Sequence, residues 1–556
     1  MNRPDSSIPT TQDGSALAVS YARAAGYWTN AWRIALRRPL VVAAVVWVGA
    51  ISLVGVMAPF LANGHPIVLR AVQQGTLGPA TFPLLGHLTA ADWILAAGLP
   101  VATACLLWPA PGGRERRVRM LVLAIVQAAL IIGATHVLRA WSLDRGAPAA
   151  LASWARREWF VPAACAGIAA LIILAFVLAP GPGGAVRRAA AFGLVGAGAA
   201  LATAQTWRPL PDVFDYLAQE REGRAQAIYT IVPWSPAQRP GDRNAKLLPP
   251  GSTHDQSLAR AVLSSLPGDA DVTESQAQRA RATIASLPLS TELKESLDAI
   301  VAEATGSGAM DRRQMQDQLV SALAASGRVH ALGTDAFGQD VLSQLIHACR
   351  LAISIGLVST GIAVLIGVIV GAIMGYFGGI VDLVLYRVVE VFMAVPLLFV
   401  LIVAAAVLPR NIYVTMAVIG CFTWMGAARF TRAEFLRLRG LDFVLAARAI
   451  GAPVRSILFR HMLPNGIAPV LVDASFGVAL AIVFEATLSF LGLGAEGQAS
   501  WGRLLADATS EAGDFVWWLA VIPGGVIFLT ALAFNLIGEA LRDAVDPRLR
   551  HAGRAG

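Results

Sequence analysis

The chain has 556 residues, of which 56% are hydrophobic and 14% are charged. Because soluble domains carry about 25% charged residues, this composition excludes a soluble enzyme, a disordered chain and a coiled coil, and it indicates an integral membrane protein. We attribute the formal net charge of +8 to basic residues in cytoplasmic loops rather than to a nucleic-acid-binding surface. The four cysteines lack the spacing of metal ligands, so we expect no metal site and no disulfide framework.

The first apolar segment, residues 39–62, is long enough to cross a bilayer, which requires about 20 apolar residues. Arg37 and Arg38 precede it, and basic residues favour the cytoplasmic side, so we expect residues 1–38 to lie in the cytoplasm. The segment exceeds the length of a signal-peptide core and is followed by no small-residue cleavage site. We therefore predict a helix that stays in the membrane.

Four more apolar segments are predicted to form an inserted group of transmembrane helices within residues 90–206. They are residues 93–108, 120–138, 160–178 and 189–206. If the first helix runs outward, the basic loops at 114–119 and 187–188 fall in the cytoplasm, as the positive-inside rule requires. The loop at 139–159 then falls outside although it contains four arginines, which disagrees with that rule.

Residues 207–330 are too polar to span a membrane and are predicted to form an external, mainly helical insert. Its first part is rich in proline, and the apolar periodicity of its second part predicts four helices. They are residues 255–266, 273–287, 291–303 and 312–325. The alternative interpretation is a simple spacer.

Five further apolar segments are predicted to complete an all-α membrane protein with about ten transmembrane helices. They are residues 351–374, 388–408, 413–430, 467–491 and 515–537. An even total returns the C-terminus to the cytoplasm. The charges agree, because the loop at 429–461 carries seven arginines against two acids, whereas the loop at 492–514 carries four acids against one arginine.

The loop at 429–465 has the sequence of a helix–turn–helix on the cytoplasmic face. We expect a helix at 432–445, followed by the small residues Ala446 and Ala447, which allow close approach to another surface. Gly451 permits a change of direction that a residue with a Cβ resists. Such a structure exposes an apolar edge suited to a groove in a partner protein.

This loop resembles the coupling ("EAA") loop of importer permeases in the ATP-binding-cassette (ABC) superfamily. The resemblance covers residues 331–550 and part of the first helix. It is carried by Ala58-Pro59-Phe60, 332–342, 375–379, Asp382, Arg387, Pro396, 446–451, 457–465, 485–494, 501–502 and 535–548. In this order the motifs are similar to those of the second permease subunit of dipeptide and oligopeptide importers, which implies a type I ABC importer permease fold.

Three features depart from the family pattern. Leu445 occupies the position of the family's glutamate in the coupling loop, and Gln339 the position of its usual arginine in the external motif. The segment between the first helix and Leu332 is much longer than the short external loop of the family. Within it, residues 249–254 are similar to the sequence that in the family comes directly before the Leu332 motif. In this chain the helical insert separates these residues from that motif.

The resemblance implies a permease subunit that forms half of a pathway for peptides or similar small solutes. It implies a homologous second permease, two ABC ATPase subunits and an extracytoplasmic solute-binding protein as partners, with the chain in the bacterial inner membrane and no nucleic acid bound. ATP and Mg²⁺ would be bound by the ATPase subunits, and this chain would bind no cofactor. The phosphate-binding pattern G-x-x-x-x-G-K-[ST] is absent, because neither Lys246 nor Lys294 follows a glycine, so we expect no enzymatic activity.

Three groups of candidate residues follow. The ATPase-coupling candidates are Ala446, Ala447, Arg448, Gly451, Arg460, His461, Leu463, Pro464 and Asn465. The external motif comprises Gly333, Thr334, Asp335, Gly338 and Asp340, which either order a loop beneath the binding protein or cap the following helix. Glu485 is an acid within a span, where ionisable groups are usually functional, and it either contacts substrate or forms an internal hydrogen bond. Arg460 and His461 are equally consistent with charges that follow the positive-inside rule.

Two other classes of function remain as alternatives. An ion-gradient-driven transporter would need paired acids near the middle of the membrane, and the sequence suggests Glu485 alone as such an acid. A membrane-anchored sensor or assembly protein would need a cytoplasmic output domain, for which the loop at 429–461 is too small.

Overall fold

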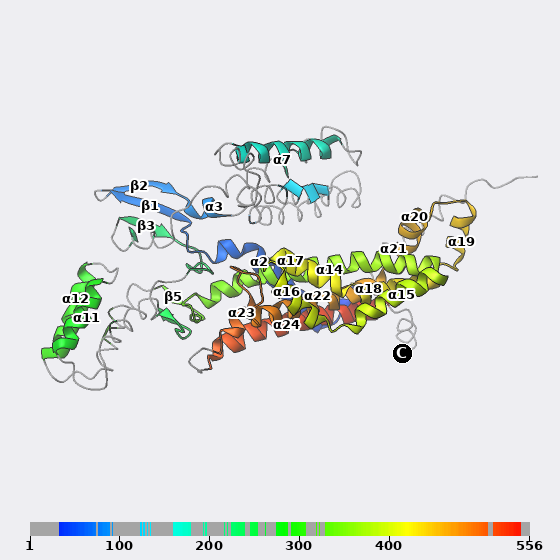
Figure 1. Ribbon diagram of the computed structural model, residues 1–556. Helices are drawn as coiled ribbons and strands as arrows, with labels where there is room; N and C mark the ends of the chain where they lie inside the picture. Colours follow the sequence, from blue (N-terminus) through cyan, green and yellow to red (C-terminus); the bar gives the residue numbers. More distant parts are fainter. Residues whose placement is uncertain are drawn as a thin grey trace, which may run out of the picture. The chain divides into compact units, whose positions relative to one another are not determined.

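The computed structural model describes residues 33–73, 76–88, 160–178, 224–238, 245–253, 274–286, 291–306, 328–509 and 515–545, with isolated positions between them. It is mostly helical (Figure 1). The chain divides into two compact units, one formed by residues 1–55 with 344–556 and the other by residues 56–343.

Four helices among the described residues are long and apolar enough to cross a membrane. They are α2 (Pro39–Leu61), α14 (Val341–Phe377), α22 (Ala468–Phe490) and α24 (Trp517–Val545). Two bent pairs raise the number of candidate spans to six: α15 (Gly379–Ala394) with α16 (Leu397–Val407), and α17 (Ile412–Thr423) with α18 (Met425–Leu438).

The two bent pairs replace two spans that we expected to be continuous. The axis turns by 77° between α15 and α16, where Val395 precedes Pro396 and is therefore driven out of the helical region. The axis turns by 41° at Trp424, between α17 and α18. The predicted helix at 432–445 is also wrong, because α18 ends at Leu438 and a new helix, α19 (Asp442–Ala449), begins after a three-residue turn.

The inserted helices are described only in part. The helix α7 (Phe160–Leu178) matches one of the four predicted segments. Segments 93–108, 120–138 and 189–206 lie outside the described residues apart from isolated helical positions, and the total of ten spans stays a prediction.

Glycines allow α14 and α18 to pack with their backbones in contact. Gly367, Gly371 and Gly375 lie four residues apart on α14, and a Cβ at any of them would clash with α18. Small residues at this spacing are a common feature of tightly packed helices in membranes. The first residues of the coupling loop are therefore fixed directly against α14.

The second unit contains two small antiparallel sheets, so the all-α prediction is wrong for this part of the chain. The first sheet has the order β2-β1-β3, with β1 (Val68–Gln73), β2 (Thr76–Thr81) and β3 (Ala225–Ile228). The second pairs β4 (Ser252–Thr253) with β5 (Val329–His330). A short helix, α3 (Pro83–His87), follows β2.

The two segments that we predicted to be inserts each begin and end at paired strands. Residues 82–224 connect β2 to β3, both of which pair with β1, and residues 254–328 connect β4 to β5. Within the second insert, α11 (Glu274–Ser286) and α12 (Thr291–Gly306) pack together at the positions expected from sequence. The predicted helices at 255–266 and 312–325 lie outside the described residues, apart from isolated positions.

Candidate functional site

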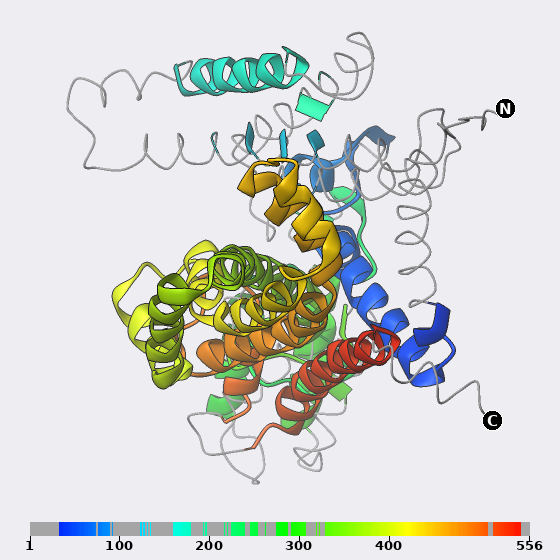
Figure 2. The ribbon, with the colours of Figure 1, turned by 90° about the vertical axis from the view of Figure 1, so that its right-hand side faces the viewer.

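The coupling-loop candidates form a compact helical hairpin after α18. The helix α19 is followed by α20 (Val454–Ser456), a π-helical turn η2 (Ile457–Met462) and α21 (Leu463–Gly466). These elements lie at the end of the helix bundle that faces the viewer in Figure 2, where they are coloured gold. Pro464 lies in the first turn of α21, which continues directly from η2, so it does not end the helical segment.

Gly451 forms the turn that ends α19, as the sequence predicted. Its φ is +74°, in the left-handed region that other residues rarely adopt. The Gly451 N–H donates to the carbonyl of Arg448, and the Ala452 N–H donates to the carbonyl of Ala447, both at 3.0 Å. This pair of bonds is a Schellman motif, which closes the end of the helix and fixes the direction of the chain that follows.

The hairpin has its own apolar core, which attaches it to the end of α14. Val444 and Ala447 of α19 and three residues of η2 are buried with Ala372 of α14 and Phe435 of α18. We expected Ala447 to lie against a partner protein, but its small side chain instead allows α19 to pack against η2 and α18. Ala446, the other small residue, is exposed.

The opposite face of the hairpin exposes apolar side chains. Ile450, at the turn, is 82% exposed, and Leu445 is 48% exposed. Leucine at 445, where the family has glutamate, therefore enlarges this face rather than the buried core. The exposed apolar residues are Leu441, Phe443, Leu445, Ile450, Val454 and Phe459; we call them the apolar edge.

The basic residues among the coupling-loop candidates make different contacts. The guanidinium of Arg448 lies over the ring of Tyr376, at the end of α14, 4.6 Å from its centroid. Arg460 is exposed, and His461 is partly exposed, with its carbonyl accepting a hydrogen bond from the Asn465 side chain at 2.7 Å. Leu463 packs against the apolar core of the hairpin. Arg448 thus attaches α19 to α14, while Arg460 lies on the surface.

The external motif forms a buried, self-bonded loop in the second unit. Asp335 accepts hydrogen bonds from the N–H groups of Phe337 and Gln339, both at 2.8 Å. Asp340 caps α14 by accepting from the Ser343 N–H at 2.7 Å. Its other oxygen lies 2.8 Å from Nδ1 of His330. Asp335 therefore orders the loop, and Asp340 caps the helix. Each of the two roles that we considered from the sequence thus belongs to a different residue.

The same loop joins the two segments that the helical insert separates. The Leu248 N–H donates to the Thr334 hydroxyl at 2.8 Å, and that hydroxyl donates to the carbonyl of Ala245 at 2.6 Å. Gly333 and Gly338 both have positive φ, and a Cβ on Gly333 would clash with the carbonyl of Leu248. Residues 249–254 and the motif at 332 are therefore neighbours in space.

Glu485 is buried and bonded to its own protein. One carboxylate oxygen accepts from the hydroxyls of Ser489, at 2.7 Å, and Ser500, at 2.8 Å. Ser500 also caps the short helix α23 (Trp501–Ala506). Glu485 therefore ties α22 to α23, which agrees with the internal hydrogen bond that we considered as one of its two roles.

Sequence reasoning missed a second acid within the same span. Asp473 lies on α22, and its carboxylate lies against Gly426 at the start of α18, where a Cβ would approach it to within 2.9 Å. We named Glu485 alone as an acid near the middle of a span; Asp473 lies nearer the start of α22 and Glu485 nearer its end. Among the described residues, no group of three or more His, Cys, Asp or Glu side chains is arranged to hold a metal ion.

Comparison with known proteins gives a consistent set of relatives. A family model described as "Binding-protein-dependent transport system inner membrane component" matches residues 367–551, which include the hairpin and Glu485. The oligopeptide transport system permease protein OppC of Haemophilus influenzae is 39% identical over 42% of this chain and 75% of its own length. OppC of Bacillus subtilis is 36% identical over 40% and 72%. The peptidoglycan transport system permease protein YejE of Agrobacterium fabrum is 38% identical over 40% and 58%.

Proposed function

The chain belongs to the family of binding-protein-dependent transport system inner membrane components and is a permease subunit of an ABC importer, and from this premise we propose that it forms half of a pathway for peptides or similar small solutes. A homologous permease would supply the other half. Two ATPase subunits would bind and hydrolyse ATP with Mg²⁺, and a solute-binding protein would deliver the cargo. We infer no enzymatic activity for this chain itself.

The observation that carries the proposal is the rigid hairpin with its apolar edge. The Schellman turn at Gly451, the buried contact between Ala447 and η2, and the position of Arg448 over Tyr376 all fix α19 relative to α14. Exposed apolar side chains on a short helix are suited to a groove in a partner protein. We assign that groove to an ATPase subunit.

The mechanism that follows is alternating access. ATP binding and hydrolysis change the separation of the ATPase subunits, and the hairpin moves with them. Because the hairpin is attached to α14 and α18, its movement shifts the helices between an inward-facing and an outward-facing arrangement. The nucleotide must therefore bind the two arrangements unequally.

Peptides are the proposed cargo because of the relatives. The relatives include permeases named for oligopeptide, dipeptide and peptidoglycan transport. We expect the termini to lie in the cytoplasm and the inserts to extend from the membrane, with the solute-binding protein outside.

The test is recovery of ATPase subunits with the tagged chain. Ile450→Asp places a charge in the apolar edge and is expected to reduce the recovered ATPase about tenfold, since an exposed hot-spot residue contributes at least 1.4 kcal/mol to such an interface. Phe515→Asp is the matched control, because Phe515 is also an exposed apolar residue, 69% exposed, but lies outside the hairpin. Equal recovery with both variants would contradict the proposed function.

A further inference from the structure

An ion pair connects the helix that leads into the hairpin to the bent pair α15–α16. Arg432 of α18 binds Asp382 of α15 through two bonds, from Nε to Oδ1 at 2.5 Å and from Nη2 to Oδ2 at 2.7 Å. Its guanidinium also lies over the ring of Tyr386, 4.7 Å from the centroid. A two-bond arginine–carboxylate pair fixes the relative orientation of its partners as well as their distance.

The same turn of α15 is held by a second arginine of the loop. Gly378 and Gly379, which begin α15, have φ of +66° and +54°. The guanidinium of Arg439 lies against Gly378, at the place that a Cβ would occupy. The start of α15 is thus in contact with Arg432 of α18 and with Arg439, which directly follows α18.

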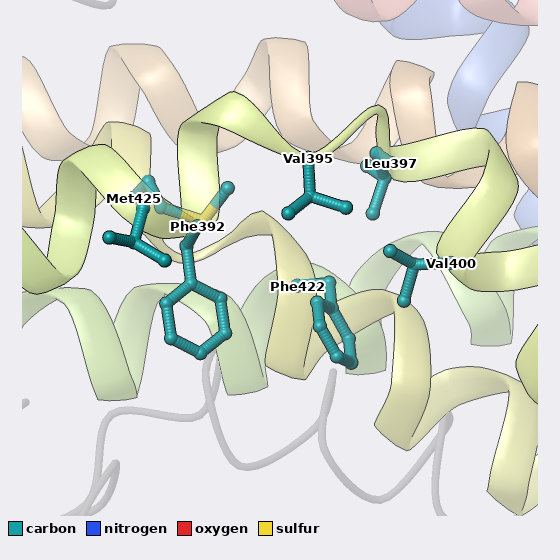
Figure 3. A pocket seen from close by; sticks show the side chains of 7 residues that line it. Phe392, Val395, Leu397, Val400, Phe422 and Met425 are labelled. Carbon is teal, nitrogen blue, oxygen red and sulfur yellow. The ribbon is translucent and has the colours of Figure 1, made fainter.

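The other end of α15 lies at the bend between α15 and α16. The 77° bend at Val395 and Pro396 has a partly open apolar groove of about 180 Å³ on one side. Phe392, Val395 and Leu397 line it from the bend, and Met425 lines it from the start of α18 (Figure 3). Val391 and Val395 beside the groove are 66% and 47% exposed, so few side chains of this chain oppose a change in the angle of the bend.

We propose that Asp382 and Arg432 are positioning residues that transmit movement of the hairpin to α15, and that the bend at Pro396 converts this movement into a displacement of α16. This inference rests on the proposed function, because it requires the hairpin to be moved by ATPase subunits. It adds a second route from the hairpin, through α15, to the direct backbone contact between α18 and α14.

A coupling role is distinguishable from a stabilising role by charge exchange. Partly exposed ion pairs contribute little to folding, so Asp382→Arg and Arg432→Asp should still assemble with the ATPase subunits and hydrolyse ATP at the basal rate. Stimulation by the loaded binding protein, and transport itself, should fall about tenfold in each, as expected for residues within a coupling route. The double variant D382R/R432D restores the pair in reverse and should recover most of the stimulation.

The control is an ion pair that stays within one helix. Arg437 pairs with Glu434 on α18, at 2.6 Å, and cannot connect α18 to α15. Arg437→Asp should leave stimulation unchanged. If both single variants behave like this control, or if the double variant assembles but stays uncoupled, the inference is overturned. Arg432→Lys keeps the charge without the two-bond geometry and should give partial stimulation, which provides a test even if the charge reversals fail to assemble.

A distance measurement tests the bend itself. Ile380 and Val407 lie at opposite ends of the bent pair and are 79% and 77% exposed, so both positions should accept spin labels once the native cysteines are replaced. The distance between the labels should change when ATP is added to the complex, and Arg432→Asp should abolish this change. No change in the parent complex would contradict the inference, whereas failure of the parent chain to bind ATPase subunits would contradict the proposed function instead.

Discussion

Arg38, at the start of α2, and Asp543, near the end of α24, form an ion pair at 2.8 Å. The start of α2 therefore lies beside the end of α24. A second contact agrees with this arrangement, since Nε1 of Trp47 donates to the Thr530 hydroxyl at 3.2 Å. We therefore expect an even number of membrane crossings, as the charges of the loops predict.

This relationship leads to a prediction about topology. Ala446→Cys, on the exposed side of α19, should be protected from a membrane-impermeant thiol reagent in intact cells whose outer barrier has been opened. Gln278→Cys, on the exposed side of α11, should react under the same conditions. Both should react after the inner membrane is permeabilised. Labelling of position 446 in intact cells would place the hairpin outside and contradict the coupling role.

The turn at Gly451 leads to a prediction about coupling. Gly451→Val forces a β-branched residue into a left-handed conformation, at a cost of about 1–2 kcal/mol, and should reorient the hairpin. We expect ATPase stimulation by the loaded binding protein to fall about tenfold, measured on the purified complex. Gly440→Val is the matched control, because Gly440 lies in the same loop, has open space around it and has no positive φ. Equal activity of the two variants would show that the turn is not needed.

Glu485 leads to a prediction that separates its two possible roles. Glu485→Gln keeps an oxygen that accepts from Ser489 and Ser500, so it should retain transport if the role is structural. Glu485→Ala leaves both hydroxyls without this acceptor and should lower the free energy of unfolding by about 1–3 kcal/mol for each unsatisfied group. Thermal unfolding in detergent measures this change. A well-folded Gln variant that has lost transport would instead point to a need for the charge.

The strand pairing at the second insert leads to a prediction about deletion. Thr253 and Val329 are opposite each other in the β4–β5 ladder, so the residues between them can be replaced by the two-residue turn Asn-Gly, which closes an antiparallel hairpin. The shortened chain should assemble and support stimulated ATPase activity. A deletion that also removes β4 and β5 should fail to assemble. If the first deletion fails as completely as the second, the insert is part of the core.

The sequence predicted those features that depend on local composition. The start of α2 follows two arginines, and its end follows a continuous apolar run, so its limits were visible without the structure. The turn at Gly451 was predicted for the same reason, since a glycine between two helical patterns is a local signal. Pro396 was also a local signal for a bend. The continuous apolar sequence around it led us to predict one uninterrupted helix instead.

The remaining features depend on contacts between distant parts of the chain. Strand β1 pairs with β3 across most of the first insert, and strands so short have no periodicity that distinguishes them from loops. Asp382 and Arg432 are 50 residues apart, and neither position alone indicates its partner. The burial of Ala447 depends on η2 and α14, which is why a residue expected at an interface lies in the core of the hairpin.

The two pairs of strands at which the inserts begin and end have a consequence for how this chain relates to shorter permeases. When the ends of a loop are already held side by side, its closure entropy rises only slowly with length, by about 0.6 kcal/mol for each doubling. A long segment is thus tolerated almost as readily as a short turn, provided that the two strands at its ends stay paired. The length of such a segment can therefore change while the strands at its base stay paired.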